Sequence, residues 1–145
     1  MRALVQRVSS ASVEVEGKTV GSIGRGLLLF VGFGRQDVPA SLAAAVNKLL
    51  ELRVFSDERG KMNLSLKDVH GGVLIVSQFT LYANCGRGRR PDFTSAASPP
   101  HAERLYDEFV RLFKQSGIEV QTGVFAADMK VSLLNDGPVT LMLEF

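Results

Sequence analysis

The chain has 145 residues, a length that suits one domain with a sizeable buried core. Apolar residues make up 46% of the sequence and charged residues 22%, proportions that exclude an intrinsically disordered chain. The formal net charge is only +2, although the basic residues are unevenly distributed. We therefore expect a single domain over residues 1–145.

The sequence shows no targeting or zinc-binding pattern. The first residues lack the apolar core of a signal peptide and no apolar run approaches a membrane span, so we expect a cytoplasmic protein without a membrane partner. Cys85 is the single cysteine, and with His70 and His101 it makes too few ligands for a Cys/His zinc site. EF-hand and P-loop patterns are missing, so we expect no metal and no cofactor. Counting residues leaves Mg²⁺ or Ca²⁺ binding by carboxylates open.

The first half of the chain is predicted to contain four strands and one helix. Alternating apolar residues, a turn at residues 16–18 and an apolar run between Gly26 and Gly32 predict strands over residues 2–8, 12–16, 19–23 and 27–31. From Pro39 onward, apolar residues recur at helical spacing. The polar segment 55–68 is expected to be irregular.

The second half is predicted to contain a long helix between strands. Residues 73–79 form the next strand, and a helix follows Ser98, a preferred N-cap residue, with Pro99 at its first position and Gly117 at its end. The remaining predicted strands are residues 118–122, 129–134 and 139–145. The predicted fold class is α/β: a mixed, largely antiparallel sheet with two helices covering one side.

Two polar segments at strand ends form a candidate site. Ser77-Gln78-Phe79-Thr80-Leu81 ends one apolar strand, and Asn135-Asp136-Gly137-Pro138-Val139-Thr140 separates the last two strands. A Gly-Pro pair within strand sequence needs a reason, because proline removes a ladder donor and glycine weakens a strand. Together the two segments predict a site built from strand ends.

The side chains near these segments do not form a recognisable hydrolase triad. Ser77 or Thr80 could supply a nucleophile, but the sequence places neither His70 nor His101 to act as its base. A G-x-S-x-G elbow is also missing. What remains are hydroxyls, amides and backbone donors, which can stabilise a developing oxyanion. Such a site suits an activated ester whose own neighbouring hydroxyl activates water.

A glycine-rich loop over residues 86–91 carries a concentration of positive charge. Its arginines are Arg87, Arg89 and Arg90, whose guanidinium groups suit contacts to nucleic-acid phosphates. A solvated loop that only aids solubility explains the same residues. The loop by itself does not decide between the two interpretations.

The chain resembles the D-aminoacyl-tRNA deacylases, the D-tyrosyl-tRNA deacylase family, through the motifs at residues 77–81 and 135–140. Supporting similarity lies at residues 2–8, 60–65 and 88–93. The resemblance implies a homodimer with a barrel-like sheet that hydrolyses the ester bond of D-aminoacyl-tRNA, and of glycyl-tRNA mischarged on tRNA-Ala, without a cofactor. It implies rejection of L-amino acids by backbone groups.

The resemblance also implies roles for the Gly-Pro motif. Gly137 and Pro138, joined by a cis peptide bond, would enter the site of the partner subunit and present their carbonyl groups to the α-carbon of the amino acid. Arg7 would brace this element. The related deacylases that act on L-alanyl-tRNA have a trans bond here and are one alternative; a non-catalytic tRNA-binding module of the same fold is the other.

The roles implied for the first motif concern the ester itself. The backbone of Phe79 and Thr80 would bind the aminoacyl carbonyl, and Ser77 and Gln78 would shape a pocket for the terminal adenosine. Thr80 is the natural candidate nucleophile, but we favour a mechanism without a side-chain nucleophile. Residues 84–86, Asn-Cys-Gly, depart from the more basic residues expected there, which weakens the expected tRNA contacts of this loop.

Overall fold

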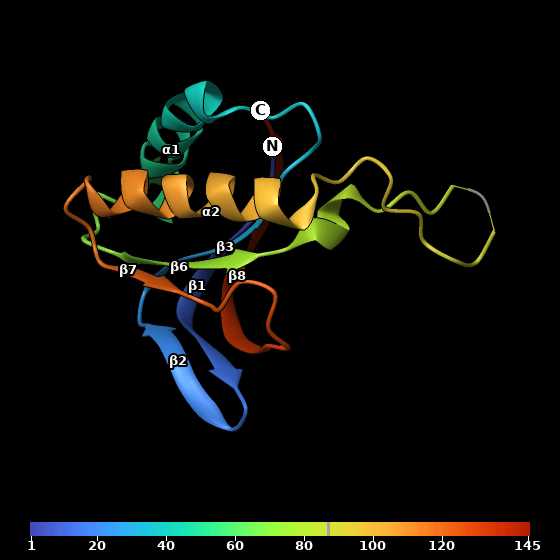
Figure 1. The fold of residues 1–145 in the computed structure, drawn as a ribbon. Coiled ribbons are helices and arrows are strands. Elements are labelled where there is room, and N and C mark those ends of the chain that lie inside the picture. Colours follow the sequence, from blue (N-terminus) through green and yellow to red (C-terminus); the bar gives the residue numbers. More distant parts are fainter. Residues whose placement is uncertain (87) are drawn as a thin grey trace.

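A curved mixed sheet forms the centre of the fold in this computed structural model, which describes residues 1–86 and 88–145 (Figure 1). Hydrogen-bonded neighbours in the sheet follow the order β2-β1-β3-β6-β7. β8 pairs with β1 along the edge opposite β2 and β3. The strands are β1 (Arg2–Val15), β2 (Lys18–Ile23), β3 (Gly26–Gly32), β6 (Gly72–Ser77), β7 (Val120–Thr122) and β8 (Lys130–Glu144). The predicted α/β class is confirmed.

β1 and β8 are each one long strand where the sequence predicted two short ones. They pair antiparallel along almost their whole length. The hydrogen bonds between the two strands keep each of them extended through its polar middle segment. Gln6 pairs with Thr140 and Val8 with Asn135, so residues 136–139 bulge out opposite Arg7. The Gly-Pro pair therefore lies outside the regular ladder.

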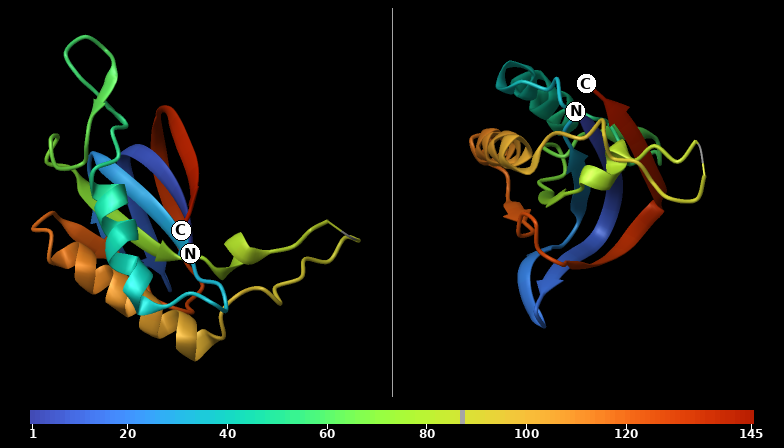
Figure 2. Two further views of the ribbon diagram at one scale, coloured as in Figure 1. Left: turned by 90° about the horizontal axis from the view of Figure 1, so that it is seen from above. Right: turned by 45° about the vertical axis from the view of Figure 1, so that its right-hand side comes forward.

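The sheet curls toward a barrel. β1 pairs antiparallel with β2, β3 and β8, whereas β3, β6 and β7 run parallel to one another. At the far side β2 bends back against β7, where a Cβ on Gly21 would lie 2.5 Å from the carbonyl oxygen of Thr122. Gly21 permits this close approach of β2 to β7 because glycine has no side chain. Figure 2 shows the curvature of the sheet from two further directions.

Two helices cover one face of the sheet. α1 (Leu42–Leu50), which follows the 3-10 turn η1 (Pro39–Ser41), and α2 (Pro99–Lys114) lie side by side over β3 and β6 (Figure 1). Ser98 occupies the N-cap position of α2 and its carbonyl accepts the Ala102 amide at 2.8 Å, but its hydroxyl makes no capping bond in the described structure. None of the described helices is long and apolar enough to cross a membrane.

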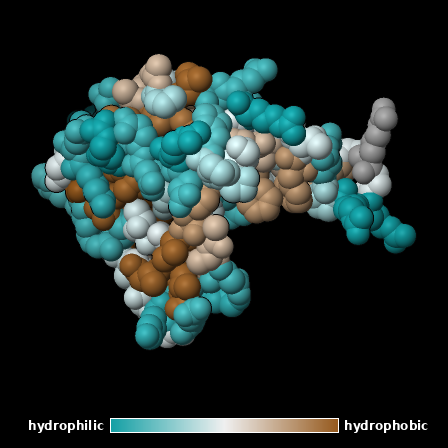
Figure 3. Space-filling model, viewed as in Figure 1, coloured by the Kyte–Doolittle hydropathy of each residue, from teal (hydrophilic) through white to brown (hydrophobic). Residues whose placement is uncertain are grey.

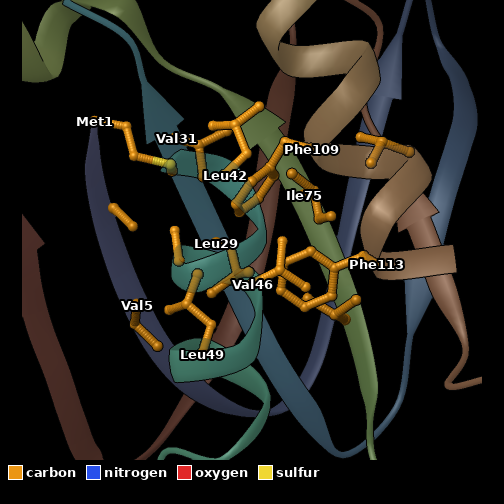
Figure 4. Close-up of a cluster of buried hydrophobic side chains, with 14 of the residues drawn as sticks. Met1, Val5, Leu29, Val31, Leu42, Val46, Leu49, Ile75, Phe109 and Phe113 are labelled. Carbon is orange, nitrogen blue, oxygen red and sulfur yellow. The ribbon is translucent and has the colours of Figure 1, made fainter. Parts of the chain in front are cut away.

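The main core lies between the helices and the sheet (Figure 4). Alternate residues of β3 and β6 point to it, as the period of two requires, and the intervening residues face a smaller cluster on the other side of the sheet. Among the core side chains drawn in Figure 4 are Val5, Leu29, Val31, Leu42, Val46, Leu49, Ile75, Phe109 and Phe113.

The prediction of an irregular segment over residues 55–68 was partly wrong. β4 (Phe55–Ser56) and β5 (Met62–Leu64) pair antiparallel as a separate two-stranded sheet. The carboxylate of Asp57 accepts the amides of Arg59 and Lys61 and so organises the turn between them. Such bonds from a side chain to nearby backbone stabilise a turn without leaving a hydrophobic period in the sequence.

Candidate active site

A cavity of about 690 Å³ opens where the parallel strands β3 and β6 end. Its size lies within the range of small-molecule sites. The walls come from the ends of both strands, the start of α2 and the segment before β8; among the lining residues are Val31, Ser77, Gln78, Phe79, Ala102, Phe125 and Met129. In Figure 3 apolar residues gather below α2 and at the base of the protruding arm.

The first motif lies at the rim of this cavity. After Ser77 the chain leaves β6 and forms the 3-10 turn η2 (Phe79–Tyr82), which shortens the strand predicted to reach residue 79. The Gln78 amide donates to the Val31 carbonyl at 2.7 Å and so fixes the start of the turn to the end of β3. The side-chain amide of Gln78 donates to the Thr80 hydroxyl. Ser77, Gln78 and Phe79 line the cavity, and Thr80 lies beside them on the turn.

The amides of Phe79 and Thr80 are the first two of η2. In the part of the chain that the structure describes, neither donates a hydrogen bond, as is usual for the first turn of a helix. Phe79 and Thr80 are both exposed, Phe79 to 57%. Two consecutive amide donors at the mouth of an apolar cavity suit a developing oxyanion.

The second motif is braced by Arg7, which is only 8% exposed. Its Nε donates to the Asp136 carbonyl at 3.0 Å and lies 3.4 Å from the Asp136 carboxylate. Its Nη1 donates to the Val54 carbonyl. Gly137 has a φ of +120°, and a Cβ there would lie 2.5 Å from Nη2 of Arg7. The Gly137-Pro138 peptide bond is cis, and both residues are exposed.

Asn135 closes the base of this bulge, a contribution that the sequence reasoning did not assign. Its side-chain amide donates to the carbonyls of Arg7 at 2.9 Å and Val139 at 3.0 Å. The side-chain oxygen of Asn135, Oδ1, accepts a hydrogen bond from the Thr140 hydroxyl at 3.2 Å. Asparagine suits this position because it has donors and an acceptor on one short side chain. The sequence did contain a sign of this role, since Asn135 and Thr140 are the first and last residues of the motif.

The structure does not bring the two motifs together within one chain. Gly137 and Pro138 are not among the residues that line the cavity. The two histidines also lie elsewhere: His70 is in a turn with a φ of +50°, and Nε2 of His101 lies 3.0 Å from the Asp37 carbonyl oxygen. Neither histidine lines the cavity formed by the described residues.

The cavity includes a wall that sequence reasoning missed. Residues 125–129 lie between β7 and β8 and contribute Phe125, Ala126 and Met129 to the lining. Ala126 has a φ of +60°, a conformation uncommon for a residue with a Cβ. The sequence signal was weak, because small and apolar residues between two strands are equally typical of a buried connection.

A narrow arm, residues 83–86 and 88–95, extends from the rim of the cavity (Figure 1). Asn84 and Asp92 pair across its base through backbone hydrogen bonds of 2.7 and 3.0 Å. The rings of Phe79 and Phe93 pack edge to face with centres 5.0 Å apart, which joins the arm to η2. Arg89 and Arg90 are exposed on the arm, and Arg87 lies outside the described residues.

Comparisons with known proteins match the whole chain. Curated proteins named D-aminoacyl-tRNA deacylase are 56% identical in Thermotoga petrophila, covering 99% of this chain and 97% of that protein, and 57% identical in Saccharophagus degradans, covering 99% of both. A solved structure titled c-Myc DNA Unwinding Element Binding Protein superposes with a TM-score of 0.94 at 40% identity, over 100% of this chain and 99% of the other.

A second solved structure, titled as a probable eukaryotic D-amino acid tRNA deacylase, has a TM-score of 0.85 over 98% of this chain and 97% of the other. Its 21% identity supports the fold alone. The family model described as D-Tyr-tRNA(Tyr) deacylase matches residues 4–144. The resemblance in the two motifs is thus confirmed over nearly the full length, and the chain belongs to the D-Tyr-tRNA(Tyr) deacylase family of enzymes.

Proposed function

We propose that residues 1–145 act as one domain that hydrolyses D-aminoacyl-tRNA to a free D-amino acid and tRNA in the cytoplasm. The observation that carries this proposal is the full-length similarity, at 56 and 57% identity, to proteins named D-aminoacyl-tRNA deacylase. We extend it to glycyl-tRNA mischarged on tRNA-Ala. Glycine has no side chain for a steric filter to reject.

The cavity is proposed to receive the terminal adenosine of the tRNA. Its volume of about 690 Å³ accommodates a nucleoside, and Phe125 and Met129 offer apolar contacts to a base. Ser77 and Gln78 supply polar groups at the end nearest η2. The ester of the terminal ribose then lies close to Phe79 and Thr80.

Backbone donors are proposed to carry the chemical step. The amides of Phe79 and Thr80 have no acceptor among the described residues and can bind the aminoacyl carbonyl as it becomes an oxyanion. The Thr80 hydroxyl accepts a hydrogen bond from Gln78, and no histidine lines the cavity within the described residues. The described lining therefore offers no histidine base to a threonine nucleophile, and its one carboxylate, Asp128, is paired with Lys130 at 3.0 Å. The vicinal hydroxyl of the ribose is proposed to activate water.

Chirality is proposed to be read by a second copy of the chain. Gly137 and Pro138 are exposed and do not line their own cavity, which supports insertion into the site of a partner subunit in a homodimer. There their carbonyl groups would occupy the space of an L side chain. A D side chain points the other way and glycine has none, so both are accepted.

Release of amino acid from charged tRNA tests the function. We expect the purified protein to deacylate D-tyrosyl-tRNA, D-aspartyl-tRNA and glycyl-tRNA, and to spare L-tyrosyl-tRNA at the same enzyme concentration. A chelator should leave the rate unchanged. Cleavage of L-alanyl-tRNA with D-aminoacyl-tRNA spared would instead assign the related L-alanine type, and tRNA binding without cleavage would assign a non-catalytic module. Glycyl-tRNA that resists while D-aminoacyl-tRNA is cleaved would contradict steric rejection.

A matched pair of variants tests the backbone mechanism. Phe79→Pro removes the Phe79 amide hydrogen at the first position of η2, where proline is tolerated, whereas Phe79→Ala keeps it. Loss of one oxyanion donor lowers kcat by about 10² to 10³. We expect a loss of that size for Phe79→Pro beyond any loss in Phe79→Ala. Equal single-turnover rates in the two variants would refute a catalytic role for this amide.

A further inference from the structure

The far end of η2 is held by a residue outside the cavity. Nη1 of Arg2, at the start of β1, donates to the Leu81 carbonyl at 2.8 Å. The guanidinium carbon of Arg2 lies 4.6 Å from the centre of the Tyr82 ring, within the range of a cation–π contact. Nε of Arg2 also pairs with Glu144 of β8 at 2.9 Å. The last two residues of the turn are thus clamped to the edge of β1.

Tyr82 extends this clamp to the loop after β3. Its hydroxyl donates a long hydrogen bond of 3.3 Å to Oδ2 of Asp37, and the same oxygen accepts the Gly34 amide at 2.7 Å. The ring lies so close to Gly34 that a Cβ there would be 2.8 Å from a ring carbon. Burial, together with Asp37, raises the pKa of Tyr82 to about 12, so the hydroxyl stays a donor well into the alkaline range.

Asp37 connects the η2 turn, through Tyr82, to two further segments of the chain. Its Oδ1 accepts the α-amino group of Met1 at 3.0 Å, and its carbonyl oxygen lies 3.0 Å from Nε2 of His101 in the first turn of α2. The neighbouring residues Pro99 and Ala102 of α2 line the cavity. The clamp therefore joins β1 and the loop after β3 to η2 and α2, both of which contribute residues to the cavity lining.

We propose that Arg2, Asp37 and Tyr82 are positioning residues for ester hydrolysis, which hold η2 so that the amides of Phe79 and Thr80 face the aminoacyl carbonyl. The inference rests on the proposed function. Gln78 fixes the start of the turn at β3, and the clamp fixes its end, so the two amides lie between two anchors. Oxyanion donors act only within a narrow distance range, and a displacement of about 1 Å can cost about 10² in rate.

The chain offers a control, because its other tyrosine also donates its hydroxyl to an acceptor within the protein. Tyr106 of α2 donates to the Ile75 carbonyl at 2.9 Å, away from η2. Tyr82→Phe and Tyr106→Phe each remove one hydroxyl and keep the ring. Each should lower the melting temperature by a few degrees, since a hydrogen bond contributes about 1 kcal/mol. If the role of Tyr82 were purely structural, both variants would lose stability and both would keep the wild-type rate.

We expect Tyr82→Phe to lower the single-turnover rate on D-tyrosyl-tRNA by about tenfold, with tRNA affinity unchanged, and Tyr106→Phe to keep the rate within about twofold. Arg2→Ala should lose more rate than Arg2→Lys, because lysine can still donate to the Leu81 carbonyl. If wild-type protein releases no D-amino acid, the proposed function itself fails. If it does and the two tyrosine variants have equal rates, or Arg2→Ala matches the wild type, the positioning role is refuted.

Discussion

At the scale of single residues, Arg7 is the most constrained side chain around the candidate site. A buried cation is costly unless hydrogen bonds replace its water, and Arg7 donates to the carbonyls of Asp136 and Val54. These two carbonyls lie in segments far apart in the sequence. Arg7 therefore fixes the Gly-Pro bulge to the body, and Gly137 must remain without a side chain to admit the guanidinium.

Gly137→Ala is expected to displace Arg7 as well as strain the backbone. Gly17 is a control, because it also has a positive φ of +76° but a Cβ there meets nothing within 4 Å. We expect Gly17→Ala to cost about 1 kcal/mol of unfolding free energy and Gly137→Ala clearly more, about 2 kcal/mol or above. Urea unfolding of both variants measures the difference. Equal losses would mean that Arg7 adjusts without cost.

Both tyrosine hydroxyls are expected to remain protonated in strongly alkaline solution while the chain is folded. Burial, with Asp37, raises the pKa of Tyr82 to about 12, and burial also raises the pKa of Tyr106, next to Asp107. A raised pKa contributes stability that is complete below the unfolded value of about 10 and is lost as the pH rises above it. The unfolding free energy should therefore fall above pH about 10.

The chain has no tryptophan, so near-ultraviolet absorbance reports the two tyrosines directly. At pH about 11 we expect little phenolate in folded protein and nearly complete ionisation with urea present. Tyr82→Phe should remove part of the alkaline loss of stability. Folded protein that titrates with the ordinary tyrosine pKa would contradict the burial of these hydroxyls.

At the scale of elements, the arm and η2 form one connected unit. The contact between Phe79 and Phe93 joins the base of the arm to the turn at the cavity rim. Arg89 and Arg90 are exposed on the arm, so in the proposed complex a tRNA whose terminal adenosine fills the cavity would meet positive charge near its phosphates. This geometry favours the interpretation that the arm binds phosphates over the interpretation that it only aids solubility. Phosphate binding by the arm stays a prediction.

Neutralising the arm should weaken tRNA binding and reduce its salt dependence. Each lost phosphate contact lowers the slope of log K against log salt by about 0.7 to 0.9. We expect this for Arg89→Ala/Arg90→Ala, measured by tRNA titration at several salt concentrations. Arg104→Ala/Arg111→Ala removes the same charge from exposed positions on α2 and should leave the slope unchanged. Identical slopes in the two double variants would show that the arm does not contact phosphates.

At the scale of the whole molecule, one chain carries the two motifs at separate places. The cavity and η2 lie at the ends of β3 and β6, while the Gly-Pro bulge lies on β8. β8 also exposes the apolar side chains of Leu133, Leu134, Leu141 and Met142. In the proposed homodimer, a second copy of the chain would cover some of these residues and place its bulge in the first copy's site.

Mixing a bulge variant with an η2 variant tests this arrangement. Gly137→Ala impairs the bulge and keeps η2, so its homodimer should cleave L-tyrosyl-tRNA as well as D-tyrosyl-tRNA, whereas Phe79→Pro impairs η2 and should cleave neither well. A heterodimer of the two has one site with both parts intact, so it should cleave D-tyrosyl-tRNA in preference to L-tyrosyl-tRNA, as neither homodimer does. Refolding the variants together and separately, with the heterodimer purified and its mass measured in solution, makes the comparison. A proven heterodimer without this selectivity would contradict a shared site.

Much of the fold follows from patterns within the sequence. β3 was predicted from the apolar run at residues 27–31, and α2 from the apolar residues at helical spacing before Gly117. Both predictions were possible because a strand or helix with a buried side shows a regular spacing of apolar residues in its own sequence. The pairing of β4 with β5 was missed because Asp57 organises its turn through local hydrogen bonds. The continuity of β1 and β8 was missed because each stabilises the polar middle of the other.

The sequence by itself determined the family, the α/β class and the two motifs, because these depend on short segments read in order. Only the tertiary structure decided that the first motif borders a cavity, that Phe125 and Met129 complete its walls and that the second motif lies elsewhere on the chain. The clamp of Arg2, Asp37 and Tyr82 likewise belongs to the tertiary structure. These features join segments that are distant in the chain, and their geometry depends on strand order and side-chain packing, which no local pattern records.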